Sequence, residues 1–358
     1  MLSYAEYRND IEKRYEIKNK QKEMVERFIG NRALWIWGAS EKSHWLPHVF
    51  DHISGYIDRD EKKTLYNGKT VIRPEQINPQ EMYIYVALDN QYTEVRELLA
   101  KKGMNEYTDY LYPGRSNILL HGCDNGYGDV YGNEIEGSLH KPIVNFCKGI
   151  GSVLKLGKNC CIDPCAIFRM ENNSIIIIED NVVLEKDVVI DARNGGIIHI
   201  GKGAYIMKNN IINSFRNSYV HIGEKTIMCP FGIINAAQHS KVFVGEDTLF
   251  SSNCHIQPCD GHQFYDINTQ KSICAEKIYE IEIGKHVWVG RSCTILYGAK
   301  IGSGSIVGID SMVKNYVPSN VVVAGRPAGI IRKNVVWEMP GAERKDNFEE
   351  LSVYDFRS

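Results

Sequence analysis

The chain has 358 residues, and its 42 Lys and Arg nearly balance its 44 Asp and Glu, which gives a formal net charge of −2 at pH 7. This balance provides no electrostatic argument for nucleic acid or an anionic membrane as a partner. The charged start of the chain lacks the apolar core of a signal peptide, and no apolar run reaches the roughly 18 residues of a membrane span, so we expect a cytoplasmic protein.

The first 112 residues alternate between helical and apolar, strand-like segments, which predicts a small Rossmann-like α/β domain (1–112) with a parallel sheet. A charged, helix-favouring segment at 3–29 ends at Gly30. The further expected elements are strands at 33–37, 55–57 and 82–88, a helix to about His52, a helix at about 91–102 and a last apolar segment at 110–112.

The first strand-to-helix turn of this domain is Gly38-Ala39-Ser40, and Asp58 follows it after about 20 residues. This spacing is reminiscent of dinucleotide-binding turns, although the three-glycine pattern is absent. Two interpretations stay open. The domain either binds a nucleotide or nucleotide-sugar, or it is a docking or oligomerisation domain in which Gly38 only makes the turn.

Residues 113–150 are predicted to form a connector and a cap. The turn-rich segment 129–135 looks like a hairpin, and a solenoid needs such an element to cover its open end. At the other end of the chain, the tail 337–358 is charged and non-periodic, and we expect order there only where it packs on a neighbour.

Between the connector and the tail, residues 151–336 repeat with a fixed period. An apolar residue recurs at equal intervals, at Leu156, Ile178, Ile200, Ile222 and Val244, and a shorter rhythm places one at every sixth position within each repeat. This shorter spacing fits neither an α-helix nor a two-faced strand, but it fits a triangular coil with three short strands per turn. The sequence therefore predicts an all-β parallel solenoid in which each coil buries its apolar face on its neighbours.

One corner of the predicted coil carries extra residues. Three hexapeptides do not fill one interval, and the four extra positions are polar or glycine-rich at 193–196, 215–218 and 237–240. The interval from Val244 to Ile283 is much longer than the regular one, and His262 lies within this insertion. A loop with a histidine thus interrupts an otherwise regular solenoid.

Several motifs follow the repeats in a fixed order, namely DGH at 260–262, HVWVG at 286–290 and VAGRP at 323–327. Over about residues 150–335 the chain resembles the hexapeptide-repeat acetyltransferases, in the branch of sugar and polysaccharide O-acetyltransferases. The resemblance implies a left-handed β-helix, acetyl-CoA as donor, no metal, and a homotrimer with active sites between subunits. The implied reaction is O-acetylation of a sugar hydroxyl in a surface or capsular polysaccharide or its precursor.

Two residues match catalytic positions of the family. His262 matches the catalytic histidine, and a neutral imidazole can accept the proton of an acceptor hydroxyl. Trp288 adjoins the inward Val289 and should point outward, where the resemblance places it beside the donor thioester. The alternatives are a surface-loop histidine and a subunit-interface tryptophan. Asp260 or Asp266 is a candidate to orient His262.

Candidate acceptor contacts are Asn235, His239 and Asp260. Asn235 also belongs to a column with Asp191, Asn213 and Gln257, which recur at the interval of the repeat, and a polar ladder along the stack is the favoured interpretation of this column.

The cofactor end of the family match is basic, as expected for a donor that carries phosphates. The positions that the resemblance assigns to coenzyme A are Arg291, Ile309, Lys314 and Arg332. Their basic neighbours Arg326 and Lys333 are candidates to share the phosphate contacts. Two positions depart from the family, where Asn315 replaces a usual Lys and Gly329 a usual Arg.

Two other functions remain open. The α/β domain favours N-acetylation of a nucleotide-linked amino sugar, and a trimeric solenoid scaffold would need no chemistry at all. A metal site is not expected, because the ten cysteines form no CxxC pair and the histidines lack the short spacing of a metal-binding set.

Overall fold

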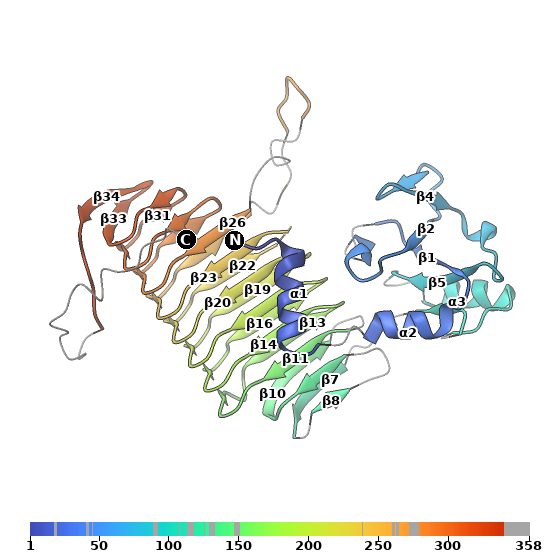
Figure 1. The fold of residues 1–358 in the computed structure, drawn as a ribbon, viewed down its shortest axis with the longest axis horizontal. Coiled ribbons are helices and arrows are strands. Elements are labelled where there is room, and N and C mark those ends of the chain that lie inside the picture. Colours follow the sequence, from blue (N-terminus) through green and yellow to red (C-terminus); the bar gives the residue numbers. More distant parts are fainter. Residues whose placement is uncertain are drawn as a thin grey trace.

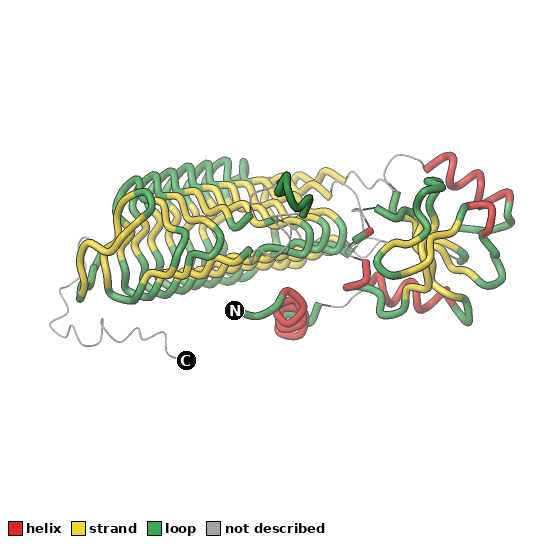
Figure 2. Tube along the Cα trace, turned by 90° about the horizontal axis from the view of Figure 1, so that it is seen from above, coloured by secondary structure: helices red, strands yellow, loops and turns green. Residues whose placement is uncertain are grey.

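The computed structural model describes residues 1–17, 20–40, 43–44, 46–88, 92–106, 108–112, 118–124, 126–128, 133–146, 151–237, 239–259, 262, 265–271 and 279–339. They form a sheet domain, a long solenoid and a helix, α1 (Tyr4–Arg14), that lies against the solenoid (Figures 1 and 2). None of the helices built from these residues has the length and apolar character needed to cross a bilayer.

The N-terminal domain is built on a six-stranded sheet in the order β3-β4-β2-β1-β5-β6. All neighbours from β4 to β6 are parallel, as predicted, and β3 is antiparallel to β4. The described part of the chain contains only three α-helices, one of which packs elsewhere, so the Rossmann type stays a prediction. The strands are β1 (Ala33–Trp37), β2 (Ile53–Ile57), β3 (Leu65–Tyr66), β4 (Lys69–Ile72), β5 (Met82–Val86) and β6 (Tyr110–Leu111).

The helices of this domain differ from the prediction in two places. The predicted helical segment 3–29 is divided into α1 and α2 (Lys20–Ile29), and α1 packs on the solenoid and not on this domain. The expected helix ending near His52 is wrong in its described part, which holds only a 3-10 helix at Leu46–His48. Pro47 lies inside this segment, and proline removes a backbone donor that an α-helix interior needs. The β3–β4 hairpin was not predicted. The α-helices are α2 (Lys20–Ile29) and α3 (Tyr92–Lys101).

The solenoid has three faces, each a sheet of strands stacked along its axis (Figure 2). Face 1 consists of β8 (Tyr127–Gly128), β9 (Glu134–Glu136), β11 (Val153–Leu156), β14 (Ile175–Ile178), β17 (Ile197–Ile200), β20 (Tyr219–Ile222), β23 (Lys241–Val244), β26 (Glu280–Ile283), β29 (Lys300–Ile301) and β32 (Tyr316–Val317).

Face 2 consists of β12 (Cys161–Ile162), β15 (Val183–Leu184), β18 (Tyr205–Ile206), β21 (Ile227–Met228), β24 (Leu249–Phe250), β27 (Trp288–Val289), β30 (Ile306–Val307), β33 (Val321–Gly325) and β34 (Ala328–Lys333). Face 3 consists of β7 (Ile118–Cys123), β10 (Leu139–Phe146), β13 (Ile167–Glu171), β16 (Val189–Arg193), β19 (Ile211–Phe215), β22 (Ile233–Ala236), β25 (His255–Gln257), β28 (Thr294–Leu296) and β31 (Met312–Val313).

The predicted apolar ladder forms the core of the solenoid. Ile178 pairs with Ile200 one coil later, which confirms the predicted period. Val244 pairs with Ile283 across the insertion, and Ile283 pairs with Ile301 across a shorter coil that lacks the extra corner residues. Because each inward side chain stacks on its equivalent in the next coil, one continuous apolar column runs through the domain.

Antiparallel hairpins close the solenoid at both ends. β8 and β9 extend face 1 before the first coil, near the predicted cap. β33 and β34 extend face 2 at the last coil. The extra residues of the long coils join face 3 to face 1, and the insertion leaves from this same corner, between β25 and β26.

Helix α1 (Tyr4–Arg14) packs on face 1 and not on the sheet of the N-terminal domain (Figure 1). It begins with a capping box in which Ser3 and Glu6 exchange hydrogen bonds. Its buried side chains Tyr4, Tyr7 and Ile11 follow helical spacing. They cover outward-facing side chains of three successive strands, namely Ile175, Ile177, Ile197 and Tyr219.

Candidate functional site

His262 is exposed within the insertion that leaves the corner between face 3 and face 1. The described insertion residues 265–271 stand away from the solenoid body (Figure 1). There Thr269 N–H donates to the Asp266 carboxylate at 2.7 Å, and this hydrogen bond lowers the pKa of Asp266. The Asp266 carboxylate therefore stabilises the turn that contains it. Asp260 lies outside the described residues.

Trp288 points outward from β27 on face 2, as predicted, with 38% of its surface exposed. Its indole Nε1–H donates to Ser251 Oγ at 3.2 Å, on the preceding coil. The neighbouring Val289 is fully buried in the solenoid core. The alternation of the strand thus fixes the indole on the surface, where a ligand can reach it.

The two predicted catalytic residues occupy different faces of the solenoid. His262 belongs to the loop between face 3 and face 1, whereas Trp288 lies on face 2. Because the coil has three sides, His262 and Trp288 point away from each other. Within one chain, the predicted base therefore does not meet the tryptophan that is predicted to lie beside the thioester.

The basic end of the solenoid, predicted to bind the cofactor, is exposed, and one of its arginines already has a partner within the chain. Arg326 donates to the Asp310 carboxylate at 2.8 Å and to its backbone carbonyl at 2.9 Å. The backbone N–H of Asp310 in turn donates to the Arg291 carbonyl. The other candidate side chains are exposed, namely Ile309, Lys314, Arg332 and Lys333.

The candidate acceptor residue Asn235 is part of a ladder along face 3. Asn213 Nδ2 donates to Asn235 Oδ1, and Asn235 Nδ2 donates to Gln257 Oε1, both at 3.4 Å. These three residues therefore form the predicted polar ladder along the stack. His239 is exposed at the next corner, with its ring 5.5 Å from that of His44 in the N-terminal domain.

Two thiols of the solenoid core, those of Cys254 and Cys293, are buried. Burial raises the pKa of Cys254 to about 12, and burial also raises the pKa of Cys293. Their Sγ atoms lie 3.2 Å and 3.0 Å from the carbonyls of Gly290 and Gly308. A thiolate is the reactive form of cysteine, so burial disfavours the reactive form of these two residues. Across the described ranges, no group of three or more His, Cys, Asp and Glu could hold a metal ion.

In the N-terminal domain, Asp58 and Lys63 form hydrogen bonds and an ion pair at the turn that was predicted to bind a nucleotide. Asp58 accepts a hydrogen bond from Ala39 N–H at 3.1 Å and forms an ion pair with Lys63 at 3.0 Å. Lys63 also donates to the Ala39 carbonyl. The carboxylate that would bind a ribose hydroxyl is thus already engaged with the turn.

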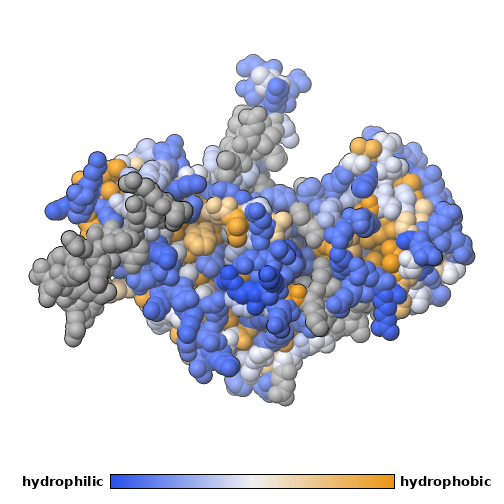
Figure 3. Space-filling view, viewed as in Figure 1, coloured by the Kyte–Doolittle hydropathy of each residue, from blue (hydrophilic) through white to orange (hydrophobic). Residues whose placement is uncertain are grey.

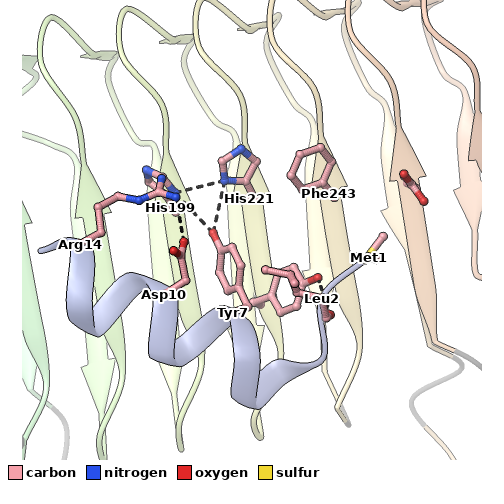
Figure 4. Close-up of a pocket in the computed structure, with 10 residues that line it drawn as sticks. Met1, Leu2, Tyr7, Asp10, Arg14, His199, His221 and Phe243 are labelled. Carbon is pink, nitrogen blue, oxygen red and sulfur yellow. Dashed lines mark hydrogen bonds and ion pairs between the residues drawn. The ribbon is translucent and has the colours of Figure 1, made fainter. Parts of the chain in front are cut away.

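A cavity of about 270 Å³ lies between α1 and face 1 (Figure 4). Beside it, His199 Nε2 lies 2.9 Å from the Glu179 carboxylate, and His199 Nδ1 lies 3.1 Å from His221 Nδ1. Tyr7 Oη lies 3.2 Å from that His221 nitrogen. Near the start of the chain, apolar side chains reach the surface (Figure 3), where Met1 and Leu2 are exposed.

We expect acid to weaken this packing through His221. Burial, and then the neighbouring His199, lower the pKa of His221 to about 3. An unfolded histidine takes up its proton near pH 6.5, so the unfolded state binds more protons between these two values. The free energy of unfolding therefore falls as the pH drops through this window, by up to about 1.4 kcal/mol per pH unit.

Denaturant unfolding at a series of pH values checks this expectation. The His221→Phe variant should lose the dependence between about pH 6.5 and 4.5. At lower pH, Glu179 also contributes, since the hydrogen bond from His199 lowers its pKa to about 2. His140→Phe is the control, because the His140 side chain is 82% exposed. Equal pH profiles for wild type and His221→Phe would contradict the assignment.

Sequence reasoning missed one contact of the site. Trp337, predicted as the start of an irregular tail, is buried against His286 and lies 6.1 Å from Trp288 between ring centroids. The available signal was a large apolar residue in an otherwise charged segment.

Comparisons with known proteins give local matches. A scan against protein-family models finds no match. The chain is 35% identical over 82 residues to a polysialic acid O-acetyltransferase of Escherichia coli O1:K1, which is 23% of this chain and 26% of that protein. It is 42% identical over 55 residues to the galactoside O-acetyltransferase of Escherichia coli K12, which is 15% of this chain and 27% of that protein.

The crystal structure of the polySia specific acetyltransferase NeuO aligns with 55% of this chain and 88% of its own, with a TM-score of 0.47 and 27% identity. In contrast to this structural alignment, the sequence matches cover only about a quarter of the polysialic acid and galactoside O-acetyltransferases. Their matches confirm the predicted resemblance to sugar O-acetyltransferases.

Proposed function

We propose that the protein transfers an acetyl group from acetyl-CoA to a hydroxyl of a polysaccharide or its sugar precursor. The observation that carries this proposal is the presence of both an exposed histidine on the long insertion and an outward tryptophan on the next coil. The similarity to O-acetyltransferases of polysialic acid and galactosides supports a sugar acceptor. A left-handed coil is part of the same proposal.

His262 is the proposed general base. Its neutral imidazole takes the proton of the acceptor hydroxyl while the oxygen attacks the thioester carbonyl carbon. The C–S bond then breaks, the coenzyme thiolate leaves, and the proton held by the imidazole passes to that sulfur. Trp288 lies against the acetyl group, and backbone N–H groups near it stabilise the developing negative oxygen.

The donor's phosphates fit the exposed basic end of the solenoid. Lys314, Arg332 and Lys333 are exposed there, and cationic side chains are the usual partners of phosphate. Arg291, Ile309 and Arg326 are proposed to line the same end, with Arg326 held in place by Asp310.

A homotrimer would join the two halves of the site. Since His262 and Trp288 lie on different sides of one solenoid, we propose that the base of one subunit meets the tryptophan of its neighbour. Closed symmetric assemblies make such shared sites possible. Asn235, His239 and Asp260 are the proposed acceptor contacts.

N-acetylation of a nucleotide-linked amino sugar is the second candidate, and the parallel sheet of the N-terminal domain favours it. The engagement of Asp58 with Lys63 weighs against it.

The deciding experiment measures transfer from labelled acetyl-CoA to two acceptor panels, oligosaccharides and nucleotide-linked amino sugars. We expect O-acetylated oligosaccharide as the product, and an Arg332→Ala/Lys333→Ala variant with a KM for acetyl-CoA raised about tenfold, which corresponds to about 1.4 kcal/mol. Acetylation of the amino sugars alone would favour the second candidate. No transfer and no binding of acetyl-CoA would refute both.

A further inference from the structure

We propose that Trp337 is a positioning residue of the donor site, which fixes the indole of Trp288 and makes the segment 334–339 part of that site. The inference rests on the proposed function, because it concerns the tryptophan that would meet the thioester.

Trp337 is anchored on His286 by several contacts. The two rings stack with centroids 4.1 Å apart and planes inclined by only 7°. Trp337 Nε1–H donates to the His286 carbonyl at 2.8 Å, and His286 Nε2 lies 2.8 Å from the Trp337 carbonyl oxygen. His286 Nδ1 is in turn 2.7 Å from the Asp247 carboxylate. The stack and the reciprocal hydrogen bonds therefore define one orientation of the Trp337 indole.

The chain reaches this position by crossing the coils. Val335 N–H donates to the Asn320 carbonyl at 3.0 Å, and Asn320 Nδ2 donates to the Val335 carbonyl at 3.2 Å. Asn320 precedes β33, whereas His286 precedes β27, two coils earlier on face 2. The segment thus runs along the turns of successive coils and is hydrogen-bonded to Asn320 at one end and to His286 at the other.

The contact with Trp288 gives the anchor a role. The ring centroids of Trp337 and Trp288 are 6.1 Å apart with planes inclined by 47°, within the range of favourable aromatic pairs. On another side, Trp288 donates its Nε1–H to Ser251. These two contacts restrict the indole while 38% of its surface stays open to a ligand. A side chain ordered in advance loses less freedom when the donor binds.

Trp337 itself is only 7% exposed, so it acts through Trp288. If Trp337 acts only through Trp288, its removal should alter the affinity for the donor but not the affinity for the acceptor. A general structural role would lower stability and affect both substrates.

The experiment compares acetyl-CoA binding by calorimetry, and KM for each substrate, in the full-length protein. Trp337→Ala should weaken acetyl-CoA binding about tenfold, at the upper end of an aromatic-pair contribution, with the acceptor KM unchanged. Trp337→Phe keeps the ring on His286 and should recover most of the affinity. Leu65→Ala, at a 67% exposed position of the N-terminal sheet, is the neutral control.

A double-mutant cycle with Trp288 separates positioning from stability. If Trp337 acts through Trp288, the Trp288→Ala/Trp337→Ala variant binds acetyl-CoA no more weakly than Trp288→Ala alone. Fully additive losses, or wild-type affinity in Trp337→Ala, would overturn the role of Trp337 and leave the proposed function intact. Failure of the wild type to bind acetyl-CoA would overturn both.

Discussion

Replacement of His262 by Ala is expected to lower kcat for acetyl transfer by about 10²–10⁴-fold, the usual contribution of a general base. The acceptor hydroxyl is a weak nucleophile until its proton is removed, and an alanine offers no group to accept it. Binding of acetyl-CoA should be unchanged, because the proposed donor contacts lie on face 2 and at the last coils. Initial rates with labelled acetyl-CoA and calorimetry measure the two effects.

Ile267→Ala is the matched control, since Ile267 lies in the same insertion and is 92% exposed. It should retain wild-type kcat. Equal activity of His262→Ala and wild type would remove His262 from the mechanism while leaving the reaction in place. A parallel loss in the Ile267→Ala variant would instead indicate that the insertion as a whole, and not the imidazole, limits the rate.

The Gly223→Ala substitution is expected to reduce the free energy of unfolding by about 2–4 kcal/mol, although it adds one methyl group. A Cβ at Gly223 would lie 2.4 Å from Glu246 N and 2.5 Å from Gly245 C on the next coil. Both are backbone atoms, which cannot turn aside as a side chain would. The coils would have to separate, and the hydrogen bond from Gly223 N–H to the Val244 carbonyl would lengthen.

Denaturant unfolding followed by circular dichroism measures this loss. Gly128→Ala is the control, because a Cβ there meets no atom of the described residues within 4 Å. It should change stability by less than about 1 kcal/mol. Similar midpoints for the two variants would show that the coils can part at Gly223 at little cost.

The solenoid was predictable because its inward apolar residues recur at a regular interval along the sequence. An inward residue such as Ile200 has apolar equivalents in the coils before and after it, Ile178 and Ile222, and stacking is the arrangement that buries all of them. The outward direction of Trp288 followed from the same alternation. The insertion was predictable because it lengthens one interval between successive inward residues.

The position of α1 was not predictable, because it depends on a surface formed only after the coils stack. The strand Ile175–Ile178 is apolar at outward as well as inward positions, which indicates a covered face but not the element that covers it. Trp337 was missed for a related reason. Its partner His286 belongs to a turn far earlier in the chain, and no periodicity links the two.

The engagement of Asp58 illustrates a third limit. The spacing from Gly38 to Asp58 predicted a possible ribose contact, but Lys63 and the Ala39 N–H occupy the carboxylate in the fold. A motif gives residue types and distances along the chain, and only the folded chain shows which groups are already satisfied.

Helix α1 has a consequence for the order in which the solenoid comes apart. Repeats that contact only their neighbours can fray from either end, one coil at a time. Arg8 donates to Asn173, Tyr4 donates to the Gly195 carbonyl, and Tyr219 donates to the Leu2 carbonyl, so one short helix fastens three successive coils. We therefore expect these three coils to open together, and fraying to begin in the coils that the helix does not reach.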